Sequence, residues 1–269
     1  MKACTVIVFL ITHLLSYSQT PITITVDKGQ GFVTLYAENR TICPVSINFN
    51  FETENMHYAY KPNEYLVVPA NTARHQLFTL YVSSGGKYRY SYKYKWFYGD
   101  VQNKNVDTAF VYELPYPIDS AYAVSQGYFG SFSHQSIRAL DFLMPEGTPI
   151  YAARAGRIVN VVQNNWQSCT QPECKDFNNI ISVYHNDGTI GEYLHLMQNS
   201  AIVKVGDLVQ QGQLIARSGN TGFSTKPHLH FWVYAATVNG IESLPTKFRV
   251  GQQIVIPEPG FKYFRRKSI

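Results

Sequence analysis

The sequence predicts an all-β protein made of an N-terminal β-sandwich followed by a second, mostly β domain. Apolar residues recur with a period of two in several short runs, and the strand-forming Tyr and Phe are abundant, with 20 and 16 copies. No segment sustains the 3.6-residue apolar period of an amphipathic helix. With 269 residues, of which 45% are apolar and 15% charged, the chain is long enough for two domains and has a globular composition.

Residues 1–18 have the features of an export signal. Lys2 precedes an apolar run that extends to Leu15, and Ser16 and Ser18 supply small residues three and one positions before a cleavage site. We expect cleavage near Ser18 and an exported mature protein, periplasmic or extracellular. No later segment approaches the roughly 20 apolar residues of a membrane-spanning helix. The formal charge of +5 is too small and too scattered to indicate a nucleic-acid partner.

The N-terminal unit is expected to span residues 19–113. Short runs of alternating apolar residues are separated by turns rich in Asn, Pro and Gly, which is typical of strands joined by tight connections. This spacing favours a β-sandwich of roughly a hundred residues. The strands are expected at 32–36, 45–51, 65–68 and 77–82.

Tyrosines alternate with basic residues in the last strand of this unit. On one face of the predicted strand lie Tyr88, Tyr90, Tyr92 and Tyr94, and on the other Lys87, Arg89, Lys93 and Lys95. We interpret the pattern as a core face backed by a solvated face. The alternative is a basic surface that holds an anionic polymer.

A proline pair marks the end of the first unit. In Leu114-Pro115-Tyr116-Pro117 the prolines remove ladder hydrogen bonds and bias the residues before them to extended conformations. We therefore assign residues 114–126 to a linker, 127–238 to the second domain and 239–269 to a C-terminal extension. Glycine-punctuated strands are expected in the second domain at 147–153, 156–162, 180–184 and 206–215.

Three cysteines follow the predicted leader. Cys169 and Cys174 are five residues apart in a polar insertion, and in an oxidising compartment they are expected to close a small disulfide loop. Joint ligation of zinc by this pair is the competing interpretation. Cys43, which precedes Pro44, is interpreted as a buried thiol.

The stretch from Lys226 to Val233 is the hardest to explain by folding alone. Side chains alternate faces in a strand, so His228 and His230 emerge on the same side, about 6.6 Å apart along the chain. Asp141 stands between apolar neighbours, where an unpaired buried charge would be costly, and His195 stands between two leucines. Two histidines and one aspartate are a sufficient set for a catalytic zinc, which takes three protein ligands and keeps a fourth position for water or substrate.

These segments resemble the lysostaphin/LytM-type zinc metallopeptidases, which cut peptide stems or cross-bridges of bacterial peptidoglycan. The resemblance covers residues 115–235 and implies a LytM-type hybrid β-barrel for the second domain. Three motifs stand in the family's order: Ser133-His134 with Leu140-Asp141-Phe142, Tyr193-Leu194-His195-Leu196, and Ser218-Gly219-Asn220-Thr221-Gly222 with Lys226-Pro227-His228-Leu229-His230-Phe231.

The resemblance implies a role for each of five side chains. His134, Asp141 and His230 would bind Zn2+, and His195 and His228 would be the two unligated catalytic histidines. The zinc would polarise the scissile carbonyl and lower the pKa of its bound water. The free histidines would orient or deprotonate that water and stabilise the developing oxyanion.

The first motif departs from the commonest pattern of the family. Many members have its His and Asp four residues apart, whereas His134 and Asp141 are seven apart, a spacing associated with a branch that carries a longer loop. Tyr128, upstream of His134, is a further candidate for binding the transition state. His185, near the end of a predicted strand, is interpreted as a turn residue without a catalytic role.

We therefore expect an exported zinc metalloendopeptidase that hydrolyses peptide bonds in peptidoglycan stems or cross-bridges, with the N-terminal sandwich positioning it on the wall or on a regulatory protein. The alternative is a non-catalytic LytM-type module that binds the cell wall or regulates an amidase. Such relatives lack one or more of the five residues, all of which are present here. A carrier domain of similar shape would be cytoplasmic and disagrees with the leader. A peptidase that acts on proteins fits the same residues.

Overall fold

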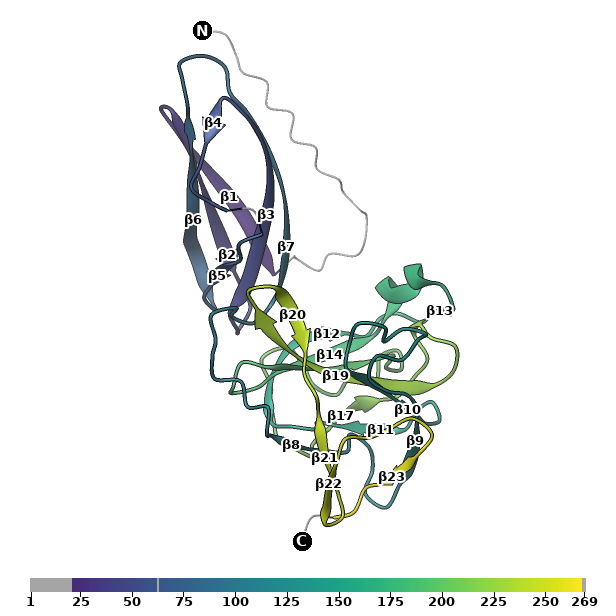
Figure 1. Ribbon diagram of the computed structural model, residues 1–269. Helices are drawn as coiled ribbons and strands as arrows, with labels where there is room; N and C mark the ends of the chain where they lie inside the picture. Colours follow the sequence, from purple (N-terminus) through teal and green to yellow (C-terminus); the bar gives the residue numbers. More distant parts are fainter. Residues whose placement is uncertain (1–20, 62, 268–269) are drawn as a thin grey trace.

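The computed structural model describes residues 21–61 and 63–267, so the predicted leader, residues 1–18, lies outside the described residues. Regular structure in this part of the chain is almost entirely β-strand, which confirms the all-β prediction. The helical segment found there is the short 3-10 helix η1 (Pro172–Phe177). None of the described residues forms a helix with the length and apolar character needed to cross a membrane. Figure 1 shows the strands gathered into two units.

The first unit is a β-sandwich of two sheets. Alternating residues of both sheets, such as Leu35, Ile47 and Leu80, are fully buried and share one core. One sheet has the order β1 (Ile22–Gly29), β2 (Phe32–Asn39), β6 (Thr72–Val82), β4 (Met56–His57), and the other β5 (Leu66–Val68), β3 (Val45–Glu54), β7 (Arg89–Tyr98).

The tyrosine-rich strand β7 has the two faces expected from its alternation. Its aromatic residues pack against the sandwich core, and its basic residues are exposed. Across the pairing with β3, Arg89 lies opposite Glu54 and Lys93 lies opposite Asn50. Because acidic and neutral side chains stand between the basic ones, this surface is a solvated face of mixed charge.

The second unit is built on a nine-stranded sheet. Its central strand β19 (His228–Thr237) lies between β15 (Ile190–Leu194) and β10 (Ala139–Leu143). The full order is β16 (Leu208–Val209), β12 (Gly156–Val162), β14 (Ile180–Tyr184), β15, β19, β10, β9 (Ala121–Gln126), β23 (Lys262–Phe264), with β20 (Gly240–Ser243) also paired to β19.

Smaller sheets complete this unit. They are β11 (Pro149–Tyr151) with β17 (Leu214–Arg217), β13 (Ser168–Cys169) with β18 (Gly222–Phe223), and β8 (Val111–Glu113) with β21 (Lys247–Val250) and β22 (Gln253–Val255).

The segments predicted as a linker and as a C-terminal extension both belong to the fold of this second unit. Tyr112, Leu114 and Tyr116 are buried in its core, because residues two apart on an extended chain face the same side. Strand β9, within the predicted linker 114–126, is part of the large sheet, and β21, within 239–269, pairs with β8. We therefore propose that the second domain comprises residues 111–267.

An apolar cluster joins the two units. Cys43 and Tyr98 of the sandwich pack with Val159, Ile190 and Tyr234 of the large sheet. Burial raises the pKa of the Cys43 thiol to about 12, so this thiol is inert, in agreement with the prediction for it. The cluster holds the sandwich against the large sheet.

His185 is a buried structural residue, as its position near a strand end suggested. Its Nδ1 donates a hydrogen bond of 2.9 Å to the carbonyl oxygen of Ala155. Its Nε2 faces Gly191, where even a Cβ atom would come within 2.9 Å. Burial lowers the pKa of His185 to about 4, so the ring is neutral near pH 7.

We expect this buried histidine to make the protein less stable in mild acid. The unfolded chain binds the proton near pH 6.5 and the folded chain only near 4, so between these values the unfolded state holds more protons and is favoured as pH falls. From pH 6.5 to 5 the loss of unfolding free energy due to His185 is about 1.5 kcal/mol. Urea unfolding at both pH values should show this loss in the wild type and a smaller one in His185→Gln, which keeps a donor for Ala155. Equal losses would contradict the assignment.

Candidate metal centre

Strand register brings together the first two candidate ligands. Asp141 on β10 lies directly opposite His230 on β19 in an antiparallel pair. Leu140 and Phe142 point into the core, so alternation turns the Asp141 side chain to the other face of the sheet. His228, two residues before His230, emerges on that same face, as predicted, and its Nε2 lies 3.6 Å from Oδ1 of Asp141.

The third candidate ligand, His134, lies in a folded loop between β9 and β10. Successive turns bend the chain: the His134 N–H donates to the Gly130 carbonyl at 3.1 Å, and the Ile137 N–H donates to the His134 carbonyl at 2.9 Å. The Phe129 N–H, at the start of the loop, donates to the Ile137 carbonyl at 3.0 Å. These bonds compensate for the seven-residue spacing, and the fully buried His134 reaches Asp141.

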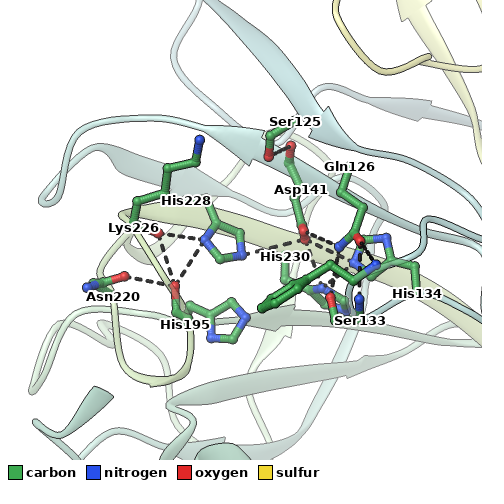
Figure 2. A network of polar contacts seen from close by, with 12 residues as sticks. Ser125, Gln126, Ser133, His134, Asp141, His195, Asn220, Lys226, His228 and His230 are labelled. Atoms are coloured by element: carbon green, nitrogen blue, oxygen red, sulfur yellow. Dashed lines mark hydrogen bonds and ion pairs between the residues drawn. The ribbon is translucent and has the colours of Figure 1, made fainter. Parts of the chain in front are cut away.

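Three potential metal-ligand atoms form a tight triangle (Figure 2). Nε2 of His134 lies 3.1 Å from Nδ1 of His230 and 3.2 Å from Oδ1 of Asp141, and the latter two atoms are 2.9 Å apart. Donors placed about 2.0–2.1 Å from a tetrahedral zinc would be roughly 3.3 Å from one another. The spacing of these buried atoms therefore fits one small metal ion with two nitrogen ligands and one oxygen ligand.

The tautomer of His134 suits metal binding. Its Nδ1 lies 2.9 Å from the carbonyl oxygen of Gly127, which can only accept a hydrogen bond. Nδ1 therefore carries the hydrogen, and in the neutral ring Nε2 presents its lone pair to the triangle. A backbone carbonyl behind the ligating ring is a common arrangement at metal sites.

The electrostatics of the triangle favour an ionised carboxylate. Burial by itself would raise the pKa of Asp141, but hydrogen bonds with His134 and His230 and the charges of His230 and His228 outweigh it, and the pKa lies well below its usual value. Burial lowers the pKa of His230, although Asp141 opposes that effect. For His134 the hydrogen bond and charge of Asp141 outweigh burial and raise the pKa.

Two further histidines lie beside the triangle, and each has one ring nitrogen that is not engaged by a backbone carbonyl. Nδ1 of His195 donates to the carbonyl of Thr221 at 2.7 Å, and Nδ1 of His228 donates to the carbonyl of Lys226 at 2.8 Å. Each ring therefore keeps the lone pair on Nε2. The rings of His195 and His228 have centroids 4.5 Å apart, and His195 lies 5.8 Å from the ring of His230.

His195 is placed by an unusual backbone conformation. It follows the last residue of β15 and has a φ of 61°, a left-handed value that costs energy for a non-glycine residue. Burial, together with the nearby rings of His228 and His230, lowers the pKa of His195 to about 3. The His195 ring is thus neutral near pH 7. All five side chains proposed from the sequence lie together in the structure.

An open cleft of about 400 Å³ leads to these residues. Asp141, His195 and His228 are among the residues that line it, and all the described lining residues belong to the second unit. Phe132 and Phe223, whose rings stack with centroids 5.2 Å apart, also line it. A peptide can therefore approach the cluster past an aromatic surface.

The cysteine pair forms the predicted disulfide, which rules out the zinc interpretation for it. Cys169 and Cys174 are bonded, and the insertion that carries them pairs with the loop before β19. The Ser224 N–H donates to the Cys169 carbonyl at 3.1 Å, and the Ser224 hydroxyl oxygen lies 3.2 Å from Nδ1 of His228. The insertion thus braces the loop that positions His228.

Tyr128 lines the cleft, and its role in binding the transition state stays a prediction. Its hydroxyl oxygen accepts a hydrogen bond of 2.6 Å from the Thr246 N–H and lies 2.8 Å from the Thr246 hydroxyl. The Tyr128 hydroxyl thus binds the C-terminal segment at Thr246. Conversely, Gln126 contacts Asp141 directly, at 3.0 Å, and no motif spacing in the sequence pointed to it.

Comparison with known proteins identifies the second unit. Residues 135–242 match the family model of peptidase family M23, a range that begins one residue after His134 and contains the other four residues of the cluster. Lysostaphin of Staphylococcus simulans is 42% identical over 93 residues, which are 34% of this chain and 17% of that protein. Peptidoglycan DD-endopeptidase ShyC of Vibrio cholerae is 36% identical over 115 residues, 43% of this chain and 23% of that protein.

Among solved structures, the catalytic domain of lysostaphin from Staphylococcus simulans is 30% identical, with a TM-score of 0.34, and the match covers 46% of this chain and 87% of that domain. The chain spans less than a quarter of the length of the two curated relatives described above, at 17% and 23%. The shared sequence lies in the second unit, and that unit carries a domain of peptidase family M23, the lysostaphin/LytM type of metallopeptidase.

Proposed function

We propose that this protein is an exported zinc metalloendopeptidase that hydrolyses peptide bonds in peptidoglycan. The strongest support is that the five-residue cluster has two parts, a set of three ligand atoms and a pair of histidines beside it. Three buried donors stand 2.9–3.2 Å apart, while two histidines keep Nε2 free beside them. The relatives named above are a lysostaphin and a peptidoglycan DD-endopeptidase, and residues 1–18 have the pattern of an export signal.

His134, Asp141 and His230 would hold the zinc. Two imidazole nitrogens and one carboxylate oxygen suit this ion better than they suit calcium or magnesium, which prefer all-oxygen sites. When bound, zinc supplies a Lewis acid for the scissile carbonyl and lowers the pKa of a coordinated water. The open cleft beside Asp141 leaves room for that water and for the substrate.

His195 and His228 would move the protons of the reaction. Water oxygen bonds to the carbonyl carbon, the C–N bond breaks, and a proton must pass from the water to the departing amine. A neutral imidazole with a free Nε2 accepts that proton and then donates it. The carbonyls of Thr221 and Lys226, which accept the Nδ1 hydrogens, stabilise the imidazolium that forms in between.

Digestion of isolated sacculi tests the proposal. The mature protein should contain about one zinc per chain, in keeping with three ligands for one ion. It should release soluble peptide-containing fragments, whose new amino and carboxyl ends are identified by mass spectrometry. A chelator should stop the release and added zinc should restore it.

Two other outcomes would contradict the proposal in different ways. Binding to sacculi without any released fragment would favour the non-catalytic wall-binding module. Cleavage of an unfolded protein such as reduced casein, with intact sacculi left unchanged, would favour a peptidase directed at proteins.

A further inference from the structure

We propose that Gln126 is a positioning residue, which turns the Asp141 carboxylate so that a single oxygen faces the metal and ties that carboxylate to the loop bearing His134. The inference rests on the metal site proposed above. It concerns a residue outside the five-residue cluster, at the end of β9.

The orientation of the Gln126 amide follows from its backbone partners. Its Oε1 accepts hydrogen bonds from the N–H groups of Phe132 and Ser133 at 3.1 and 3.2 Å. These groups can only donate, so the oxygen must face them and the NH2 must face the other way. Nε2 then donates to Oδ2 of Asp141 at 3.0 Å and to the hydroxyl of Ser133 at 2.8 Å. Both ends of the amide are used.

The two carboxylate oxygens of Asp141 therefore have different partners (Figure 2). Oδ1 lies within 2.9–3.6 Å of ring nitrogens of His230, His134 and His228. Oδ2 receives the Gln126 hydrogen bond. Among the described residues, Gln126 supplies the side-chain donor to Oδ2. With one oxygen held in this way, rotation of the carboxylate towards two-oxygen binding requires loss of that bond.

The same side chain anchors the long loop. His134 and Asp141 are separated by seven residues, so regular strand geometry does not set their spacing. Gln126 binds both residues that directly precede His134 and also binds Asp141, and it thus spans the gap. A side chain at Gly130 would collide with the Gln126 side chain, so the glycine leaves room for this arrangement.

Substitution of Gln126 by methionine tests the inference, because methionine keeps the length of the side chain and removes the amide. The zinc dissociation constant, measured by competition with a chromogenic chelator, should rise about 10–100-fold, the usual effect of removing a hydrogen-bond partner of a metal ligand. Gln126→Glu, which cannot donate to Asp141 at neutral pH, should also weaken binding. Gln135→Met is the matched control: Gln135 is exposed on the same loop, and its amide donates to the Ser131 carbonyl. It should bind zinc like the wild type.

Cobalt provides a second measurement that does not depend on activity. Four-coordinate Co2+ absorbs visible light more strongly than five-coordinate Co2+, so freeing Oδ2 for two-oxygen binding should weaken the absorption of the cobalt-loaded Gln126→Met protein. Circular dichroism of the metal-free variants reports whether they fold, and Gln126→Glu serves if the methionine variant does not. Wild-type zinc affinity and an unchanged cobalt spectrum in a folded Gln126 variant would overturn the inference. Failure of the wild type itself to bind zinc would instead overturn the proposed metal site.

Discussion

Replacement of His230 by alanine is expected to remove both the zinc and the hydrolysis of sacculi. Nδ1 of His230 lies 2.9 Å from Oδ1 of Asp141 and 3.1 Å from Nε2 of His134, so it forms one corner of the ligand triangle. A zinc site with two protein ligands left is too weak to survive purification, because catalytic zinc relies on three. Elemental analysis should show zinc falling from about one per chain to near zero.

A histidine outside the cluster provides the control for this substitution. His57 is exposed on the first unit, where its ring stacks on Tyr81. His57→Ala should retain full zinc content and full release of fragments from sacculi. Retention of stoichiometric zinc by His230→Ala would contradict the ligand set proposed here.

The His228→Ala variant should keep the zinc and lose turnover. The Nδ1 of His228 is engaged by the Lys226 carbonyl, and its Nε2 is 3.6 Å from Asp141, outside the 2.9–3.2 Å triangle. A general acid or base contributes about 10²–10⁴-fold to a rate, so the rate of fragment release should fall by that factor. The rate is measured with zinc-saturated enzyme at several sacculus concentrations.

The metal content of the same preparation separates the two roles. If His228→Ala also lost its zinc, His228 would be a ligand and the division between binding and proton transfer would be wrong. If instead zinc stayed and the rate remained that of the wild type, proton transfer would depend on His195 alone. The second result would agree with the proposed metal site and would leave His195 as the general base.

The architecture places this chemistry on one unit only. The cleft is lined by residues of the second unit, while the sandwich contacts that unit through the cluster around Cys43 and Tyr98. We propose that the sandwich positions the enzyme on the wall or on a partner, as expected from the sequence. Because the described residues of the sandwich do not line the cleft, this unit can serve that purpose without entering the reaction.

The local pattern of the chain was sufficient for most strands, whereas the choice of site residues came from the family resemblance of three motifs. Alternation predicted that β7 would carry tyrosines inward and basic residues outward, and that His228 and His230 would share a face, because the side chains of a strand repeat every two residues. The proline pair, in contrast, was misleading. Leu114 and Tyr116 are core residues, since proline permits extended chain at a sheet's margin as readily as it interrupts one.

The amino-acid sequence by itself determined the all-β class through its alternation and composition. It also predicted an export-like leader, and its resemblance to the lysostaphin/LytM family pointed to the five residues. Only the tertiary structure decided how His134 reaches Asp141 across seven residues, which nitrogen of each imidazole is free, and that Gln126 holds the carboxylate. The physical reason is the separation along the chain of the residues that interact. Strand periodicity acts between near neighbours, whereas these arrangements depend on backbone carbonyls and amide groups that meet only when separate loops pack together.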